Sequence, residues 1–237
     1  MACDLPQSQE HGDWFCPPHN NPLTCHLECH PGFVSDARTV ITCIDGLWSS
    51  TPICLEAIGL ITGNYDSPHN TVEVYGQDKH VMLPNFPDDR RYHSLDITDS
   101  HVILCGGYSS ASSCLELSLS LHWTTHSTTS SPRYKHSSAS LLGHLHLLGG
   151  YNKLSTTEHL SPASSTGWIP GHDLLESAYR SCAAKVHPEV LIVTGGYVGF
   201  AARTVISYNM TGGDAIRLQD MNTAREGHGC VYIRQSL

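Results

Sequence analysis

Short apolar runs that end in glycine recur along most of the chain. Four of them end at glycines spaced by 43, 43 and 46 residues: Gly63, Gly106, Gly149 and Gly195. The runs are about four residues long and rich in Val, Ile and Leu, which is typical of strands and too short for helices. A fixed period in this range indicates a repeat architecture, and short strands separated by turn residues favour a β-propeller.

Each repeat continues with further strand signals. Apolar and polar residues alternate over 71–75 in the first repeat and over 204–208 in the last, which predicts half-buried strands. The repeats also carry a tyrosine just after the glycines, at Tyr65, Tyr108, Tyr151 and Tyr197. Recurrence at equal register argues for packing, because a catalytic residue seldom occurs once in every repeat. We therefore expect an all-β fold.

The order of these signals resembles the kelch repeat over about 180 residues. A kelch blade has an apolar strand ending in a double glycine, a later Tyr, a later Trp (here Trp123 and Trp168), and a basic residue before a His or Ser that opens the next blade. The last signal is present as Arg91-Tyr-His93-Ser94 and Arg133-Tyr-Lys-His136-Ser137.

The resemblance has departures. The first repeat has Gly63-Asn64 in place of the double glycine and lacks the Trp, and Arg180 stands where other repeats have His. Kelch propellers usually close with more than the roughly four blades found here. Because 227–233 reads as the opening strand of another blade, we expect an incomplete propeller, with a four-bladed ring as the alternative.

Six of the ten cysteines lie in the first 54 residues: Cys3, Cys16, Cys25, Cys29, Cys43 and Cys54. A segment this short buries little apolar area, so an even set of cysteines indicates a disulfide framework. The asymmetry predicts a domain over residues 1–56 and a second over 57–237. A zinc site at Cys25-x3-Cys29 with His26 and His30 is the alternative, although the other cysteines form no second close pair.

The pattern of this first segment resembles the sushi (complement control protein) module. It reads Cys29-His-Pro-Gly-Phe33, then Cys43, then Gly46-Leu-Trp48 and Pro52-Ile-Cys54. The resemblance implies that Cys3 pairs with Cys43 and Cys29 with Cys54, that Cys16 and Cys25 form an additional bridge of the selectin type, and that Trp48 belongs to the core.

Four cysteines remain for the repeats. Cys105 and Cys114 flank a short loop, so a bridge between the two strands is geometrically plausible. Cys182 and Cys230 occupy equivalent positions in successive blades; the simpler expectation is two buried free thiols, and the pairing of these two cysteines is left open.

Charge and targeting signals restrict the setting. The formal net charge is −9 at pH 7, which argues against nucleic acid as a partner, and no apolar run approaches the length of a membrane helix. Disulfides imply an oxidising compartment, so we expect a secreted protein or the extracellular part of a membrane protein, with the signal peptide absent from this sequence. Asn209-Met-Thr211 is a glycosylation acceptor consistent with secretion.

The candidate chemistry is sparse. His144-Leu-His146 would place two imidazoles on one strand face, but the equivalents of His146 in other repeats are apolar, so we expect packing and no metal or other cofactor. Asp88-Asp89-Arg90-Arg91 is interpreted as a solvated turn. We expect no enzyme; the alternatives are a kelch-type copper radical oxidase and an intracellular kelch adaptor.

The resulting hypothesis is a non-catalytic recognition protein that binds a protein or glycan partner. Loops commonly carry binding residues while strands hold them in place. The candidate loops follow the double glycines, at 109–113, 152–156 and 198–202, and are small and polar. The pattern does not identify the individual binding residues.

Overall fold

The computed structural model describes residues 3–17, 23–30, 33–35, 40–56, 59–63, 66–75, 80–98, 101–118, 121–151, 155–160 and 167–231. Within these ranges every helix or strand element is a β-strand, as the sequence predicts. No helix in this part of the chain could cross a membrane. The chain divides into two compact units, Met1–Asn64 with Asn70–Phe86 and Leu119–His122, and Tyr65–His69 with Pro87–Ser118 and Trp123–Leu237. The domain boundary near residue 56 stays a prediction.

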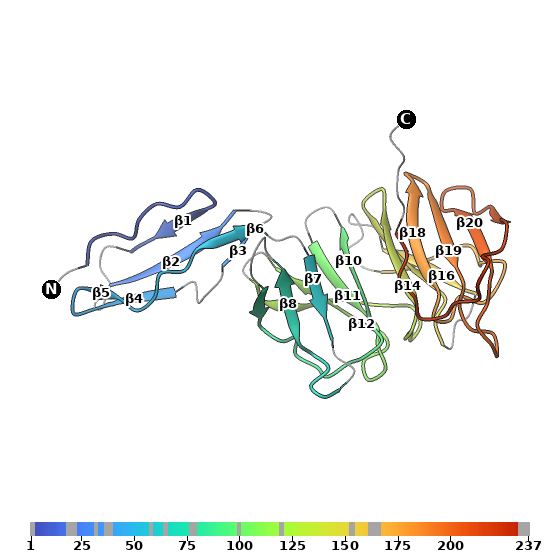
Figure 1. Ribbon diagram of the computed structural model, residues 1–237, viewed down its shortest axis with the longest axis horizontal. Coiled ribbons are helices and arrows are strands. Elements are labelled where there is room, and N and C mark those ends of the chain that lie inside the picture. Colours follow the sequence, from blue (N-terminus) through green and yellow to red (C-terminus); the bar gives the residue numbers. More distant parts are fainter. Residues whose placement is uncertain are drawn as a thin grey trace. The chain divides into compact units, whose positions relative to one another are not determined.

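The cysteine-rich segment of the first unit contains two small sheets (Figure 1). One has the order β1 (Gly12–Phe15), β2 (Thr24–Cys29), β4 (Val40–Ile44) and β5 (Leu47–Trp48), and the other pairs β3 (Phe33–Ser35) with β6 (Cys54–Glu56). The buried apolar residues there include Cys25, Leu27 and Ile41. Such a small core is stabilised by its disulfides.

Three disulfides cross this segment, joining Cys3 to Cys43, Cys16 to Cys25 and Cys29 to Cys54. Trp48 is half-buried, and its indole Nε1 donates a hydrogen bond to the carbonyl of Asp4 at 3.0 Å. This bond and the first disulfide together hold the start of the chain against the β4–β5 hairpin.

A three-stranded antiparallel sheet completes the described part of the first unit. Its order is β7 (Gly59–Thr62), β8 (Val72–Tyr75) and β9 (His80–Leu83). Val72, Val74 and Phe86 are buried there, and the side-chain amide of Asn70 donates to the carbonyl of Phe86 at 2.9 Å. We call this sheet blade 1.

The second unit holds three four-stranded antiparallel sheets, which we call blades 2, 3 and 4 (Figure 1). Blade 2 is β10 (Ser94–Thr98), β11 (His101–Cys105), β12 (Ser113–Leu117) and β13 (Trp123–Thr128). Blade 3 is β14 (Ser137–Leu141), β15 (His144–Leu148), β16 (Thr157–Leu160) and β17 (Ile169–Pro170). Blade 4 is β18 (Cys182–His187), β19 (Val190–Thr194), β20 (Val205–Asn209) and β21 (Ala215–Arg217).

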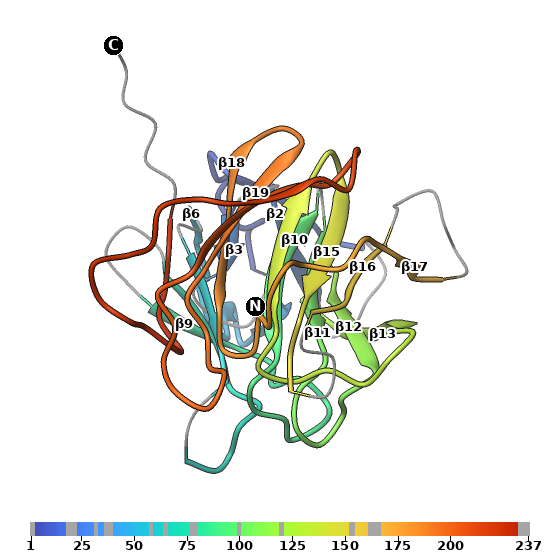
Figure 2. The same ribbon diagram turned by 90° about the vertical axis from the view of Figure 1, so that its right-hand side faces the viewer.

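Strands follow chain order across every blade, as Figure 2 shows for β10, β11, β12 and β13. The first strands of successive blades contact one another, β10 with β14 and β14 with β18. Repeated small sheets joined in this way are consistent with an incomplete propeller.

Apolar faces of neighbouring blades form the core of the second unit. Between blades 2 and 3, Ile103 and Cys105 pack with Leu145, Leu147 and their neighbours. Between blades 3 and 4, the buried set is Ala139, Leu141, Leu148, Leu174, Ala178, Leu191, Val193, Ile206 and Tyr208. Alternation along each middle strand explains the pattern, because successive side chains point to opposite neighbours.

Candidate functional site

The double glycines make a tight turn where β11, β15 and β19 end. Gly106 and Gly107 have φ angles of 64° and 112°, which favour glycine. A Cβ on Gly106 would lie 2.4 Å from the carbonyl oxygen of Arg133, and one on Gly195 would lie equally close to that of Arg225. Glycine is required here because the backbone that opens the next blade approaches this closely. We call this end of the blades the glycine end.

A buried arginine stabilises the turn in two blades. Arg133 is 2% exposed; its Nη1 donates to the carbonyl of Gly149 at 2.7 Å, and its Nε donates to Glu158 at 2.5 Å. Arg90 is equivalent, since it is wholly buried and donates to the carbonyl of Gly106 at 3.1 Å and to Asp88. The interpretation of the Asp88 to Arg91 stretch as a solvated turn is therefore wrong for Arg90.

Three large residues at the glycine end have a left-handed backbone. Tyr92, Lys135 and Arg180 have φ angles of 62°, 54° and 55°, and each lies two residues before the first strand of its blade. The amide of Lys135 donates to the carbonyl of Tyr92, and that of Arg180 to the carbonyl of Lys135, at 2.9 and 3.0 Å. These bonds between blades hold a conformation that non-glycine residues rarely adopt.

This register corrects the sequence alignment. Arg180 matches Lys135, and Ser181, directly before β18, is the residue that stands where His93 and His136 precede their own strands. Arg90 rather than Arg91 is the counterpart of Arg133, because both donate to the carbonyl of the first turn glycine.

A row of five tyrosine rings crosses the glycine end of the three blades. The distances between successive ring centroids are 5.5, 4.9, 5.6 and 6.1 Å, for Tyr108, Tyr134, Tyr151, Tyr179 and Tyr197 in that order. Backbone bonds position the rings: the amide of Tyr151 donates to the carbonyl of Tyr134, and that of Tyr197 to the carbonyl of Tyr179. We call this row the tyrosine ladder.

The ladder is largely open to solvent. Tyr108 is 60% exposed, Tyr151 50% and Tyr197 38%. The recurrence of these tyrosines predicts packing, and the rings do pack on one another, but at the surface and not in the core. Tyr65, the equivalent in the first repeat, lies outside the described residues.

One cation from each blade lies against the rings. The guanidinium carbon of Arg91 is 5.2 Å from the centroid of Tyr108, Lys135 Nζ is 4.2 Å from that of Tyr92, and Arg180 is 5.6 Å from that of Tyr179. These are cation–π distances. Lys135 Nζ also donates to the Tyr179 hydroxyl at 3.3 Å, and Arg180 forms an ion pair with Glu226 at 3.0 Å.

Neighbouring histidines add no charge at neutral pH. Burial, followed by the charge of Arg133, lowers the pKa of His136 to about 3, and burial with the charge of Arg90 lowers that of His93 to about 4. Burial and the adjacent tyrosines raise the pKa of Tyr134 above its ordinary value. The positive charge of the site therefore comes from Arg91, Lys135 and Arg180.

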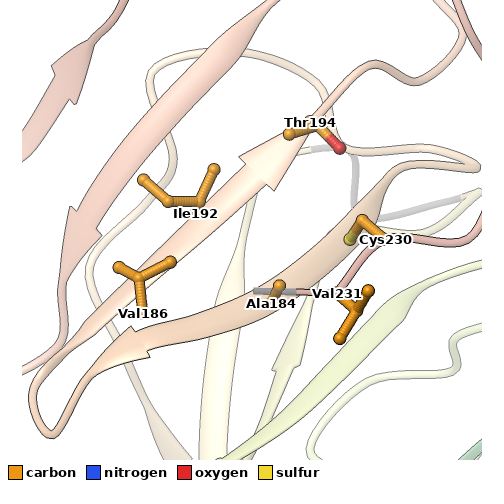
Figure 3. A pocket seen from close by; sticks show the side chains of 6 residues that line it. All are labelled: Ala184, Val186, Ile192, Thr194, Cys230 and Val231. Atoms are coloured by element: carbon orange, nitrogen blue, oxygen red, sulfur yellow. The ribbon is translucent and has the colours of Figure 1, made fainter. Parts of the chain in front are cut away.

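A second candidate feature is an apolar cavity of about 500 Å³ on blade 4. Figure 3 shows Ala184 and Val186 from β18, Ile192 and Thr194 from β19, and Cys230 and Val231 around it. Ile192 corresponds to Ile103 of blade 2, whose face is covered by blade 3. The cavity thus marks the equivalent face of blade 4. Another cavity, of about 520 Å³, lies in the first unit beside Trp14 and Trp48.

His144 and His146 lie on one face of β15, as the sequence predicts, and His159 on β16 joins them. Their ring centroids are 5.3 to 6.3 Å apart. Burial, followed by the charges of His159 and His144, lowers the pKa of His146 to about 3. Among the described residues, no group of three or more His, Cys, Asp or Glu side chains is arranged to hold a metal ion.

The remaining predicted site residues are the four cysteines of the blades and the glycosylation acceptor Asn209. Cys105 and Cys114 form a buried disulfide between β11 and β12. Cys182 and Cys230 are also joined, so the expectation of two free thiols is wrong; their Cα atoms lie 5.9 Å apart because residue 230 runs beside β18. Asn209 ends β20, and its side-chain oxygen accepts hydrogen bonds from the amides of Thr211 and Gly212.

The candidate loops differ from the expectation of small polar surfaces. The loop at 198–202 exposes Val198 and Phe200, the latter at 71%. The loop at 109–113 is tied to the blade, since Ser113 accepts a hydrogen bond from Arg90. In the third loop, residues 152–154 lie outside the described ranges, as do residues 232–233 of the expected opening strand.

Comparisons with known proteins identify the first segment. Residues 3–54 match the family model described as Sushi repeat (SCR repeat). The first 54 residues thus resemble a sushi repeat in pattern, in disulfides and by this match. Sushi repeats and disulfides are typical of extracellular proteins, and sushi repeats mediate protein interactions. No curated protein matches the chain.

A solved structure resembles the chain over a larger part. The structure described as "Structure of YjhT" superposes with a TM-score of 0.58 at 10% sequence identity, covering 66% of this chain and 61% of that one. The chain therefore spans about three fifths of the length of that protein. At this identity the similarity concerns the fold alone.

Proposed function

We propose that this chain is an extracellular, non-catalytic recognition protein, in which a sushi module is followed by kelch-type blades. The observation that carries the proposal is the combination of a sushi match over residues 3–54 with cysteines that are all joined in disulfides within the described part of the chain. Stable disulfides of this kind belong to oxidising compartments.

The glycine end of blades 2 to 4 is the proposed recognition surface. It combines exposed aromatic rings with cations, and both Tyr and Arg are enriched among residues that dominate binding energies. The double glycines and inter-blade hydrogen bonds place these side chains on a rigid scaffold, which reduces the entropy lost on binding.

The alternatives have less support. A copper radical oxidase needs a cysteine crosslinked to a tyrosine, whereas the structure uses Cys105, Cys114, Cys182 and Cys230 in disulfides. An intracellular adaptor would meet a reducing environment in which these disulfides would be rare.

Expression of the whole chain in a secretory host tests the proposal. Non-reducing peptide mapping should find the five bridges, and the purified protein should bind saturably to intact cells or to extracellular matrix. Free thiols in the secreted protein, or binding to neither surface, would contradict it.

A further inference from the structure

The tyrosine ladder has features that a structural role does not explain. Tyr108 and Tyr151 are at least half exposed, whereas the aromatic residues of the buried clusters, Tyr208 and Trp168, are almost wholly enclosed. Exposed aromatic groups that gather in one place commonly mark an interaction site. The left-handed backbone of Tyr92, Lys135 and Arg180 also indicates an interaction site, because such strained conformations persist where surrounding bonds hold them and are frequent at ligand sites.

The ladder carries positive charge although the chain as a whole is negative. The net charge is −9, yet Arg91, Lys135 and Arg180 gather along the ladder, one from each of three successive blades, and the ion pair with Glu226 offsets only the charge of Arg180. Guanidinium and ammonium groups that are half-buried against aromatic rings form stronger hydrogen bonds to carboxylate or sulfate than fully hydrated ones. The ligand class is therefore anionic.

The layout favours an extended polymer over a folded protein. Protein partners bind chiefly through anchors that fill pockets, and the two cavities described above lie elsewhere, on blade 4 and in the first unit. Along the ladder, each blade contributes aromatic rings and one cation. Such a row matches a linear polymer in which rings and acidic groups also repeat. Tyrosine suits such a ligand because its ring offers an apolar face and its hydroxyl a polar tip.

Building on the proposed function, we propose that the tyrosine ladder binds an acidic polysaccharide. Sugar rings stack on Tyr108, Tyr151 and their neighbours, while carboxylate or sulfate groups pair with Arg91, Lys135 and Arg180. Phe200, three residues after Tyr197 in sequence, is 71% exposed and adds an apolar side chain to the loop at the blade 4 end.

The test measures binding of the whole chain to immobilised heparin, hyaluronate and neutral dextran. We expect binding to at least one acidic polymer, weakening with salt, and none to dextran. The triple variant Arg91→Gln, Lys135→Gln, Arg180→Gln should weaken binding by about tenfold or more, because charged hydrogen bonds are lost. Tyr151→Ala should weaken it at constant charge, which separates stacking from general electrostatics.

Lys185→Gln is the matched control, since Lys185 is an exposed cation near the far end of β18. It should leave binding unchanged, and near-UV circular dichroism should show that every variant is folded. Equal losses in the control and the triple variant would overturn the proposal, as would competition by polyglutamate as effective as by the polysaccharide. If neither acidic polymer binds while the protein still binds cells, the ladder proposal fails and the proposed function stands.

Discussion

Arg133 and Glu158 bond to each other inside blade 3, where their side chains are 2% and 0% exposed. Glu158→Gln leaves the arginine charge buried without its partner, so we expect it to lower the free energy of unfolding by about 3–5 kcal/mol. Glu176→Gln is the control, because Glu176 pairs with Arg217 at the surface and should cost at most about 1 kcal/mol. Urea unfolding followed by circular dichroism measures both, and similar losses would show that burial does not set the strength of these pairs.

The turn glycines allow a second comparison between single residues. Gly149 and Gly199 both have positive φ, but a Cβ on Gly149 would lie 2.5 Å from the carbonyl oxygen of Ala178, whereas one on Gly199 meets nothing within 4 Å. Both alanine substitutions carry the conformational penalty of roughly 1 kcal/mol, and Gly149→Ala must also displace the next blade. We expect a clearly lower melting temperature for Gly149→Ala than for Gly199→Ala, and equal values would exclude the steric explanation.

Single residues were the hardest level to predict. Arg90 and Arg91 are adjacent, yet one is wholly buried and the other lies on the tyrosine ladder. Their local sequence does not show which of the two is buried, because that depends on the distance from the next strand: Arg90 lies four residues before β10, as Arg133 lies four residues before β14. The structure identifies Arg90 as the buried residue, because its guanidinium donates a hydrogen bond to the carbonyl of the turn glycine Gly106.

At the scale of elements, the sushi-like segment depends on its bridges. Chain entropy assigns roughly 4 kcal/mol to Cys3–Cys43, which spans 40 residues, and roughly 3 kcal/mol to Cys16–Cys25, which spans 9. The first bridge also fixes the N-terminal segment before β1, where Trp48 donates a hydrogen bond to the carbonyl of Asp4. We expect Cys3→Ala/Cys43→Ala to expose this segment to limited proteolysis and Cys16→Ala/Cys25→Ala to leave it mostly resistant; the reverse order would contradict the assignment.

The strands were predictable because their signals are local. The apolar runs ending at Gly106, Gly149 and Gly195 correspond to β11, β15 and β19, and alternation places their side chains. The ladder was not predictable in the same way, since it joins rings such as Tyr134 and Tyr179 that belong to different blades. Register within a repeat shows that a tyrosine recurs, but only the packing of blades shows whether it is buried or exposed.

At the scale of the whole molecule, the second unit should lose stability in mild acid. The pKa values of His93, His136 and His146 fall to about 4, 3 and 3, mainly because each is buried. Above pH 6.5 these histidines are neutral whether the chain is folded or unfolded, so they add no pH dependence. Below pH 6.5 the unfolded chain gains protons that the folded chain does not, and each histidine then costs up to roughly 2 kcal/mol at pH 5.

The window between pH 6.5 and 5 isolates this effect, because most carboxylates are still ionised there. His146→Leu is the informative variant. The residues equivalent to His146 in blades 2 and 4, Ile103 and Ile192, are apolar, so a leucine suits this position. The substitution removes one imidazole from the cluster that His146 forms with His144 and His159. The urea midpoint of the variant should fall less steeply than that of the natural chain over this window. An unchanged slope would mean that His146 takes up its proton in the folded state, which would require the seam between blades 3 and 4 to admit water.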